Sequence, residues 1–463
     1  MKKRCLLISP PGELFIFPRG IMEIATFLNR RGFPTTVLPL GFYFKKDYPV
    51  DESGFIKGNI DQMEVYHILI DTIRSVDPMV IGVSNCYTKD FHNCVDIIKM
   101  CKEIDARIIT VMGGSHATFC DVESIQTAPG LDIVVRGEGE WVMLNLLRAI
   151  YEKRDYQAVK GITIGENGKI RRNEDEIHGS LAEIPPVDFG LLPADFVKMS
   201  YIHGILHRGC AYHCKYCIEE KFWGKPRPYR IEKVIQEMEM LQKSYQTQFT
   251  GLEESMLGMH SKKFFQFFQS IRENDIRLPT DFYITTRIDT VTDEGIDTMR
   301  QTGISRTCVG IESFSQKVLR EMNKSLSFES VHSGCEKLMR NNIWLTGYWL
   351  IGHPGDDAHE ADHTYGQFKS FLEKGLLKSG YAFIFVPYPG TEFFYDPGKY
   401  GIRIFSYDWS RWRRWTSEPV SCLENFSSSE IVAAYDKATD LLSTYKKLNQ
   451  YLASNRERVN FHS

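Results

Sequence analysis

The sequence of 463 residues lacks the features that mark membrane, fibrous and nucleic-acid-binding proteins. It contains no apolar run near the ~20 residues that a membrane-spanning helix needs. The 56 Lys and Arg residues nearly balance the 59 Asp and Glu residues, so no overall basic field attracts the chain to nucleic acid. There is no internal repeat and no low-complexity tract. These absences leave a globular protein, for which 43% apolar and 25% charged residues are typical.

The start of the sequence also lacks the apolar core of a secretory signal. Met1 to Arg4 leads directly into a short strand-like run, Cys5 to Ser9. Cysteine is scarce, with eleven residues, most of them scattered along the chain. In a reducing compartment such residues are usually buried thiols. We therefore expect a cytoplasmic protein with no membrane span, and its length allows about three domains.

Residues 1–155 alternate short β-rich apolar runs with amphipathic helical segments. This alternation predicts an α/β domain, a doubly wound parallel sheet that binds ligands at the carboxyl edge of its strands. The expected strands are 5–9, 35–38, 79–84, 107–112 and 132–136, and the expected helices lie near 19–31, 62–75, 89–103 and 141–152.

Residues 156–198 are expected to form a hairpin and a linker. Asn167-Gly168 supplies the tight turn of the hairpin, and the paired prolines 185–186 hold the following chain extended. A second alternating series over 199–400 predicts a partial (β/α)6 barrel of the TIM type, with its chemistry on the loops that follow the strands. Residues 401–463 are expected to be a small, mainly helical segment or lid. In it Trp409, Trp412 and Trp415 fall at helical spacing, which favours core packing.

Three cysteines follow the first strand of the second series as Cys210-x3-Cys214-x2-Cys217. Their spacing lets one loop wrap a compact metal centre. A structural zinc site normally has four protein ligands, and no fourth cysteine stands nearby. Iron–sulfur clusters are commonly held by four thiolates, so three cysteines leave one iron open to another ligand.

This loop resembles that of the radical S-adenosylmethionine (SAM) superfamily, including the aromatic Tyr216 before the last cysteine. The resemblance implies that Cys210, Cys214 and Cys217 hold a 4Fe-4S cluster whose open iron is chelated by the amino and carboxylate groups of SAM. An electron from the cluster then cleaves the sulfonium bond, and a 5′-deoxyadenosyl radical abstracts a hydrogen atom. The cofactor carries this chemistry, while the protein supplies position and excludes water.

Further motifs of the same resemblance stand at the predicted strand ends. In relatives, an arginine after the third strand and the carboxylate of a Gly-x-Glu-Ser motif help to hold SAM. Arg287 equally fits a structural ion pair, and Gly352 equally fits a simple turn. An acidic pair, Glu253-Glu254, stands where relatives carry aspartates. The SAM-binding residues implied are Tyr216, Glu253, Arg287, Glu312, Ser313 and Gly352.

The first domain resembles the cobalamin-binding domains that precede some radical SAM barrels. Four motifs at successive strand ends carry this resemblance, and glycines there let a nucleotide tail lie against bare backbone. The cobalamin-binding residues implied are Pro10, Ser84, Tyr87, Gly113, Gly114, His116, Ala117, Gly137 and Glu138. The Asp-x-His-x-x-Gly loop that supplies a histidine to cobalt elsewhere is absent, as it is in many members of this group.

The combined resemblance implies a cobalamin-dependent methyltransferase acting on an unactivated carbon or phosphorus of a small molecule. One SAM would methylate the cobalamin and a second would generate the substrate radical, so both cofactors would face one pocket. The alternatives are a radical cyclisation, rearrangement or oxidation on the same scaffold, or a zinc-binding protein that is no enzyme. An external electron donor such as flavodoxin or ferredoxin is implied, and no nucleic-acid partner is expected.

Overall fold

The computed structural model describes residues 2–11, 16–44, 60–166 and 169–460, without the side chains of 166, 253–255 and 451–460. The turn expected at Asn167-Gly168 lies outside these residues. The chain divides into two compact units, residues 1–203 with 232–248, and residues 204–231 with 249–463. No helix within the described ranges is both long and apolar enough to cross a membrane.

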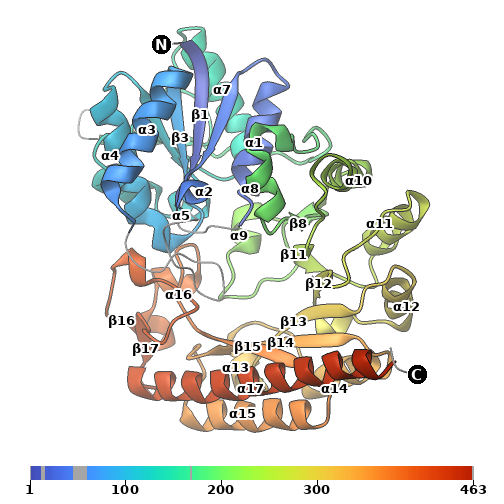
Figure 1. Cartoon of the computed structure of the whole chain (residues 1–463). Helices are drawn as coiled ribbons and strands as arrows, with labels where there is room; N and C mark the ends of the chain where they lie inside the picture. Colours follow the sequence, from blue (N-terminus) through green and yellow to red (C-terminus); the bar gives the residue numbers. More distant parts are fainter. Residues whose placement is uncertain (1, 12–15, 45–59, 167–168, 461–463) are drawn as a thin grey trace. The chain divides into compact units, whose positions relative to one another are not determined.

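The first unit is built on a seven-stranded sheet of order β2-β1-β3-β4-β5-β6-β7 (Figure 1). The first five strands in this order are parallel, as the alternating pattern predicts, and a hairpin of β6 and β7 continues the sheet antiparallel to β5. The hairpin predicted after the first domain is therefore part of its sheet. The strands are β1 (Lys2–Ser9), β2 (Thr35–Pro39), β3 (Pro78–Ser84), β4 (Ile109–Gly113), β5 (Ile133–Val135), β6 (Ile162–Glu166) and β7 (Lys169–Arg172).

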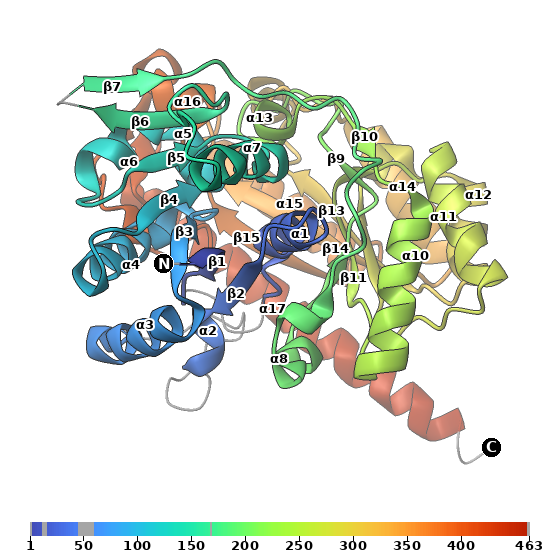
Figure 2. The ribbon, with the colours of Figure 1, turned by 90° about the horizontal axis from the view of Figure 1, so that it is seen from above.

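Helices cover both faces of this sheet: Figure 2 shows α1 and α7 on one side and α3 and α4 on the other. Their buried faces come from apolar residues at helical spacing, such as Val65, Leu69 and Ile73 of α3. The helices are α1 (Arg19–Asn29), α3 (Gln62–Val76), α4 (Phe91–Ile104) and α7 (Gly139–Tyr151), with short α2 (Leu40–Tyr43), α5 (Ser115–Phe119), α6 (Asp121–Thr127) and α8 (Ala194–Met199) and single turns at Thr88–Asp90 and Phe189–Leu191.

Helix α10 (Ile231–Met240), with the wider turn Leu241–Tyr245 that continues it, packs within the first unit. Lys233 of α10 donates to Glu23 of α1 at 2.9 Å and to Glu237 at 2.8 Å, and Arg19 lies 3.1 Å from Glu237. Glu237 also accepts a hydrogen bond from the Val187 backbone in the linker. Two cations and two carboxylates therefore form a buried network between α1, α10 and the linker.

The second unit contains an open six-stranded sheet of order β15-β14-β13-β12-β11-β8, parallel from β11 to β15. This open parallel sheet confirms the partial (β/α)6 barrel predicted from the sequence. The strands are β8 (His203–Gly204), β11 (Gly251–Leu257), β12 (Tyr283–Thr286), β13 (Arg306–Glu312), β14 (Trp344–Ile351) and β15 (Ser379–Ile384). Two antiparallel pairs stand apart from this sheet, β9 (His207–Arg208) with β10 (Arg227–Pro228) and β16 (Ile402–Ile404) with β17 (Ser421–Leu423).

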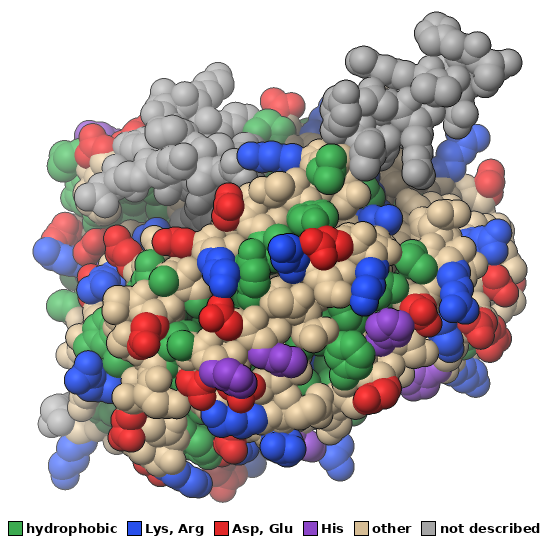
Figure 3. All heavy atoms as spheres, turned by 90° about the horizontal axis from the view of Figure 1, so that it is seen from below, with side chains coloured by type: hydrophobic (Ala, Val, Ile, Leu, Met, Phe, Trp, Pro, Cys, Tyr) green, Lys and Arg blue, Asp and Glu red, His purple; other side chains and the backbone are tan. Residues whose placement is uncertain are grey.

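Helices follow the strands of this sheet in turn. Several start at side-chain caps, as where Asp357 accepts a hydrogen bond from the Glu360 backbone at the start of α15. The helices are α9 (Glu219–Trp223), α11 (Lys262–Glu273), α12 (Asp293–Gln301), α13 (Gln316–Glu321), α14 (Phe328–Arg340), α15 (Ala358–Glu373), α16 (Glu392–Tyr395) and α17 (Ser428–Asn460), with single turns at Ile288–Thr290, Gly398–Tyr400 and Trp409–Arg411. Figure 3 looks on the face where α15 and α17 run, which carries mixed charges and histidines.

The tryptophan segment departs from the helix that its spacing suggests, because only Trp409–Arg411 forms a turn. Trp409 and Trp412 are buried against each other with ring centroids 4.8 Å apart, as expected of core residues. Trp415 lies elsewhere, against Phe383 of β15 at 4.3 Å.

Candidate functional site

The three predicted metal ligands lie on the loop between β9 and α9. Gly209 opens this loop with φ of 90°, and a Cβ there would lie 2.5 Å from the Gly224 carbonyl oxygen. Only glycine fits this close approach, which lets the Cys210 backbone donate to Gly224. The Lys215 backbone donates to the Met322 carbonyl after α13. Backbone hydrogen bonds within the second unit therefore hold the loop at Cys210 and at Lys215.

The burial of the three cysteines favours a bound metal group. Cys210, Cys214 and Cys217 are partly buried, and burial raises the pKa of Cys217 to about 12. A thiolate there needs a compensating metal charge. A structural zinc site normally takes four protein ligands, whereas a 4Fe-4S cluster gives each thiolate its own iron and leaves one iron open with three cysteines.

A buried group of three side chains stands next to this loop. Glu312 ends β13 with φ of 66°, an uncommon conformation for this residue, and its Oε1 lies 2.9 Å from Lys324 Nζ. The Tyr216 hydroxyl donates to the same oxygen at 3.2 Å and accepts from Lys324 at 3.2 Å. One carboxylate and one ammonium thus lie beside the cysteine loop, in a form that can pair with a zwitterionic amino acid group.

Other residues assigned to SAM from the sequence make local contacts. Arg287 forms a two-pronged ion pair with Asp289 at 3.0 and 2.9 Å, and its guanidinium lies 3.8 Å from the centroid of the Tyr212 ring. The Ser313 hydroxyl is bonded to Thr364 of α15 at 3.0 Å. The side chain of Glu253 lies outside the described residues.

The turn after β14 has its own internal support. Gly352 has φ of 80°, and its backbone N–H donates to Asp356 at 2.9 Å. Burial raises the pKa of Asp356 to about 7. His353 is fully buried with its ring edge-on to Tyr216, and burial lowers its pKa to about 3. Neither His353 nor Lys324 was assigned a role from the sequence, although Lys324 stands in a recognisable Asn-Lys pair after the fourth strand.

In the first unit, the predicted cobalamin residues gather at the carboxyl ends of β1, β3, β4 and β5. Gly113 ends β4, and its neighbour Gly114 has φ of 107°. A Cβ on Gly114 would lie 2.6 Å from the Asn85 backbone, so this glycine lets two loops of the protein approach each other. Ser84 ends β3, where its hydroxyl lies 3.5 Å from the Cys86 sulfur, and Tyr87 is 47% exposed beyond it.

The remaining predicted residues of this edge differ in exposure. His116 and Ala117 are buried in α5, and burial lowers the pKa of His116 to about 3, with its Nδ1 3.2 Å from the Thr88 hydroxyl. Gly137 has φ of 67° and no atom within 4 Å of the place of a Cβ. Such open backbone suits the close approach of a ligand. Pro10 follows β1, and Glu138 precedes α7.

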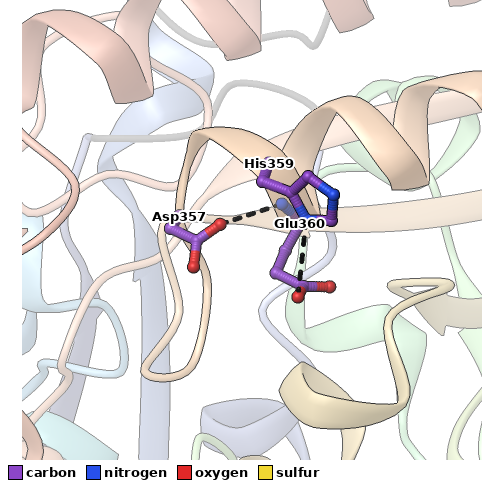
Figure 4. Close-up of side chains that lie close together, drawn as sticks. All are labelled: Asp357, His359 and Glu360. Carbon is purple, nitrogen blue, oxygen red and sulfur yellow. Dashed lines mark hydrogen bonds and ion pairs between the residues drawn. The ribbon is translucent and has the colours of Figure 1, made fainter.

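A further cluster of two carboxylates and one histidine has its side chains close to one another, and the fold explains their positions. Asp357, His359 and Glu360 stand at the start of α15 (Figure 4). Asp357 caps this helix and pairs with Lys317 at 2.9 Å, and the His359 side chain is 87% exposed. These contacts account for the group without a metal.

Comparison with known proteins also distinguishes an amino-terminal domain from a second domain. Residues 12–147 match the B12 binding domain and residues 205–367 the radical SAM superfamily. An uncharacterised methyltransferase of Pyrococcus horikoshii is 26% identical over 94% of this chain and 91% of the relative. An anaerobic magnesium-protoporphyrin IX monomethyl ester cyclase of Rubrivivax gelatinosus is 28% identical over 73% of this chain, which spans only 61% of that relative.

The fold of a solved protein extends the comparison. The structure of TsrM, a radical SAM methyltransferase from Kitasatospora setae with cobalamin and a [4Fe-4S] cluster bound, matches with a TM-score of 0.73 at 16% identity. The match covers 96% of this chain and 89% of that one. The chain therefore carries a radical SAM domain behind an amino-terminal B12-binding domain, and the cofactors of these domains are a 4Fe-4S cluster, SAM and cobalamin.

Proposed function

We propose that this protein is a cobalamin-dependent methyltransferase that acts on an unactivated carbon or phosphorus of a small molecule. The observation that carries the proposal is the presence of both cofactor domains in one chain that matches a relative named as a methyltransferase over 91% of its length. When bound, SAM at the cluster supplies a 5′-deoxyadenosyl radical, and cobalamin carries the methyl group.

The residues beside the cysteine loop are proposed to bind and orient SAM. Glu312 offers a carboxylate to the amino group of the methionine moiety, and Lys324 offers an ammonium to its carboxylate. In the structure these two side chains neutralise each other at 2.9 Å. Both are nearly buried, and a buried charge without a partner is costly. When the methionine moiety binds, the Glu312–Lys324 pair would be replaced by two pairs, Glu312 with the amino group and Lys324 with the carboxylate. Neither buried charge would be left without a partner.

The alternative is a radical cyclisation, rearrangement or oxidation without net methyl transfer. The match to the magnesium-protoporphyrin cyclase favours it, because that relative is 28% identical over 353 residues. The chain spans a smaller share of that relative, so we place methyl transfer first. An external electron donor such as flavodoxin or ferredoxin is part of the proposal, and a cytoplasmic location stays a prediction.

The test is anaerobic reconstitution of the full chain with iron, sulfide and hydroxocobalamin, followed by incubation with dithionite as reductant, methyl-deuterated SAM and a metabolite mixture. We expect 5′-deoxyadenosine together with a product that gains the deuterated methyl mass. Formation of 5′-deoxyadenosine without any labelled product would favour the alternative. The C210A/C214A/C217A variant is the control and is expected to bind no cluster and cleave no SAM.

A further inference from the structure

Four aromatic side chains gather on the sheet of the second unit. Tyr348 of β14 lies 6.2 Å from Tyr381 and 5.7 Å from Phe383, both of β15. Trp415 lies 5.4 Å from Tyr381 and 4.3 Å from Phe383. We refer to these four residues as the aromatic wall. Three of its rings, Tyr348, Tyr381 and Trp415, are only partly buried, so the wall presents aromatic surface that the protein itself does not cover.

The rings of the wall lie on the face of the sheet opposite to the helices that cover it, and Lys446 of α17 reaches the Tyr381 hydroxyl at the edge strand β15. Gly347 and Gly380 are neighbours in register, and a Cβ on Gly380 would lie 2.7 Å from Leu442 of α17. Side chains alternate along a strand, so Tyr348 and Tyr381, the next residues, point to the opposite face. Trp349 confirms this direction, because it is buried in a stack on Phe368 of α15 at 5.1 Å. The aromatic wall therefore lies on the inner face of the open barrel.

The same face holds the buried carboxylate beside the cysteine loop. Gly310, Tyr348 and Tyr381 are direct neighbours across β13, β14 and β15. A Cβ on Gly310 would lie 2.3 Å from the Glu312 carboxylate, so this carboxylate folds over the inner face at the position of Gly310. Adjacent strands are ~4.8 Å apart. The wall thus begins one strand from the proposed SAM-binding residues and extends to about 10 Å from Gly310 at the second strand.

A cation completes one side of the wall. The Arg414 guanidinium lies 5.2 Å from the centroid of the Phe383 ring and 5.7 Å from that of Trp415, and the residue is exposed. Among the residues that the structure describes, it makes no ion pair with a carboxylate. Lys446 is instead engaged, because it donates to the Tyr381 hydroxyl at 2.9 Å and fixes that ring. Arg414 is therefore a cation on the rim of an aromatic surface, with N–H groups suited to an oxyanion.

We propose that the aromatic wall binds the substrate, and that the substrate is a planar, conjugated organic anion whose ring system lies on these side chains and whose acidic group pairs with Arg414. The inference rests on the proposed function, since it names the substrate class of the same site. Half-buried rings bind a planar aromatic ligand most favourably, because stacked and edge-on ring contacts add binding free energy to that from the burial of apolar surface. A flexible aliphatic chain would gain binding free energy only from the burial of its apolar surface.

The test measures binding of three probes to the reconstituted full-length protein by equilibrium dialysis. Pyrene-1-carboxylate is planar and anionic, pyrene-1-methanol has the same ring without the charge, and decanoate is a flexible anion. We expect the first to bind at least about tenfold more tightly than either other probe, since a hydrogen bond to a charged group is worth about this factor.

Two variants separate the charge from the rings. R414Q is expected to weaken binding of pyrene-1-carboxylate about tenfold and to leave pyrene-1-methanol unchanged. W415L is expected to weaken both pyrene probes. The matched control is R413Q, because Arg413 is the adjacent exposed arginine and its Nε donates to the Ser410 carbonyl instead of lying over the wall.

The inference is overturned if decanoate binds as tightly as pyrene-1-carboxylate, or if R414Q and R413Q behave alike. SAM cleavage is measured separately, with dithionite as reductant and no probe present. Failure of the proposed function would show as SAM cleavage without transfer of the labelled methyl group, together with normal selective probe binding. Failure of the inference would show as normal SAM cleavage without selective probe binding.

Discussion

The buried ion network between α1 and α10 allows a sharp test of how the first unit is held together. Lys233, Glu23 and Glu237 have side chains no more than 2% exposed, and Lys233 contacts both carboxylates within 2.9 Å. Replacing Lys233 with Met removes a cation that contacts two buried carboxylates, Glu23 and Glu237. Removing one partner of a buried pair costs about 3–5 kcal/mol. We expect K233M to lose this much stability.

The same helix offers a matched control. Lys243 lies 3.4 Å from Glu239 in an i,i+4 pair whose side chains are 74% and 36% exposed. Such surface pairs are worth about 0–1 kcal/mol. K243M makes the same chemical change at the surface and is expected to cost no more than this. The comparison separates loss of a buried charge from the general effect of replacing lysine with methionine.

The assay is urea unfolding followed by circular dichroism, with hydrogen exchange of residues 231–245 to localise the effect. For a unit of this size, about 3–5 kcal/mol corresponds to a fall in Tm of about 6–20 °C. The K233M/E237Q double variant removes one charge of each sign, so we expect it to lose less than the sum of the single variants. A K233M variant as stable as K243M would refute the reasoning.

The network also predicts a pH dependence. Burial alone would raise the pKa of Glu237, but Lys233 and Arg19 outweigh it, so this pKa is lowered below its ordinary value of 4.5. A lowered folded pKa adds stability that is complete above 4.5 and is lost as pH falls through the folded value. In K233M the main opposing charge is gone. Without it, burial and Glu23 outweigh Arg19, and the folded pKa of Glu237 rises above 4.5. A raised folded pKa lowers stability as pH rises from 4.5, so the cost of K233M is expected to be largest near pH 7 and smallest near pH 4, measured as Tm between pH 3 and 7.

Three further predictions concern the two candidate sites. Y216F removes the hydroxyl that bonds Glu312, and it is expected to weaken SAM binding severalfold while the iron content is unchanged; loss of iron would show instead that the ring supports the cluster. D356N removes a carboxyl whose pKa is raised to about 7, so wild-type stability should fall from about pH 4 to 7 relative to the variant, and parallel Tm profiles would contradict this. G114A places a Cβ 2.6 Å from the Asn85 backbone at positive φ and is expected to cost about 1–3 kcal/mol in urea unfolding, so full stability would show that the loops can separate.

The sequence alone determined the α/β class, the order of the two cofactor domains and the cysteine loop. These follow from local signals: alternating apolar runs, turn residues, and three thiols within eight positions of one another. Strand alternation also predicted the order of the secondary structure elements, because each parallel crossover must return to the same sheet. Local signals of this kind depend on neighbours along the chain, so they can be recognised without a structure.

Only the tertiary structure decided which side chains meet. Lys324 reaches Glu312 because the chain returns after α13, and Arg414 reaches Phe383 from a segment that the tryptophan spacing had suggested to be a helix. Gly114 faces a second loop of the protein, which a pair of glycines at a strand end does not reveal. Such contacts join residues far apart in sequence, and their existence depends on strand register and loop path, which periodicity does not encode.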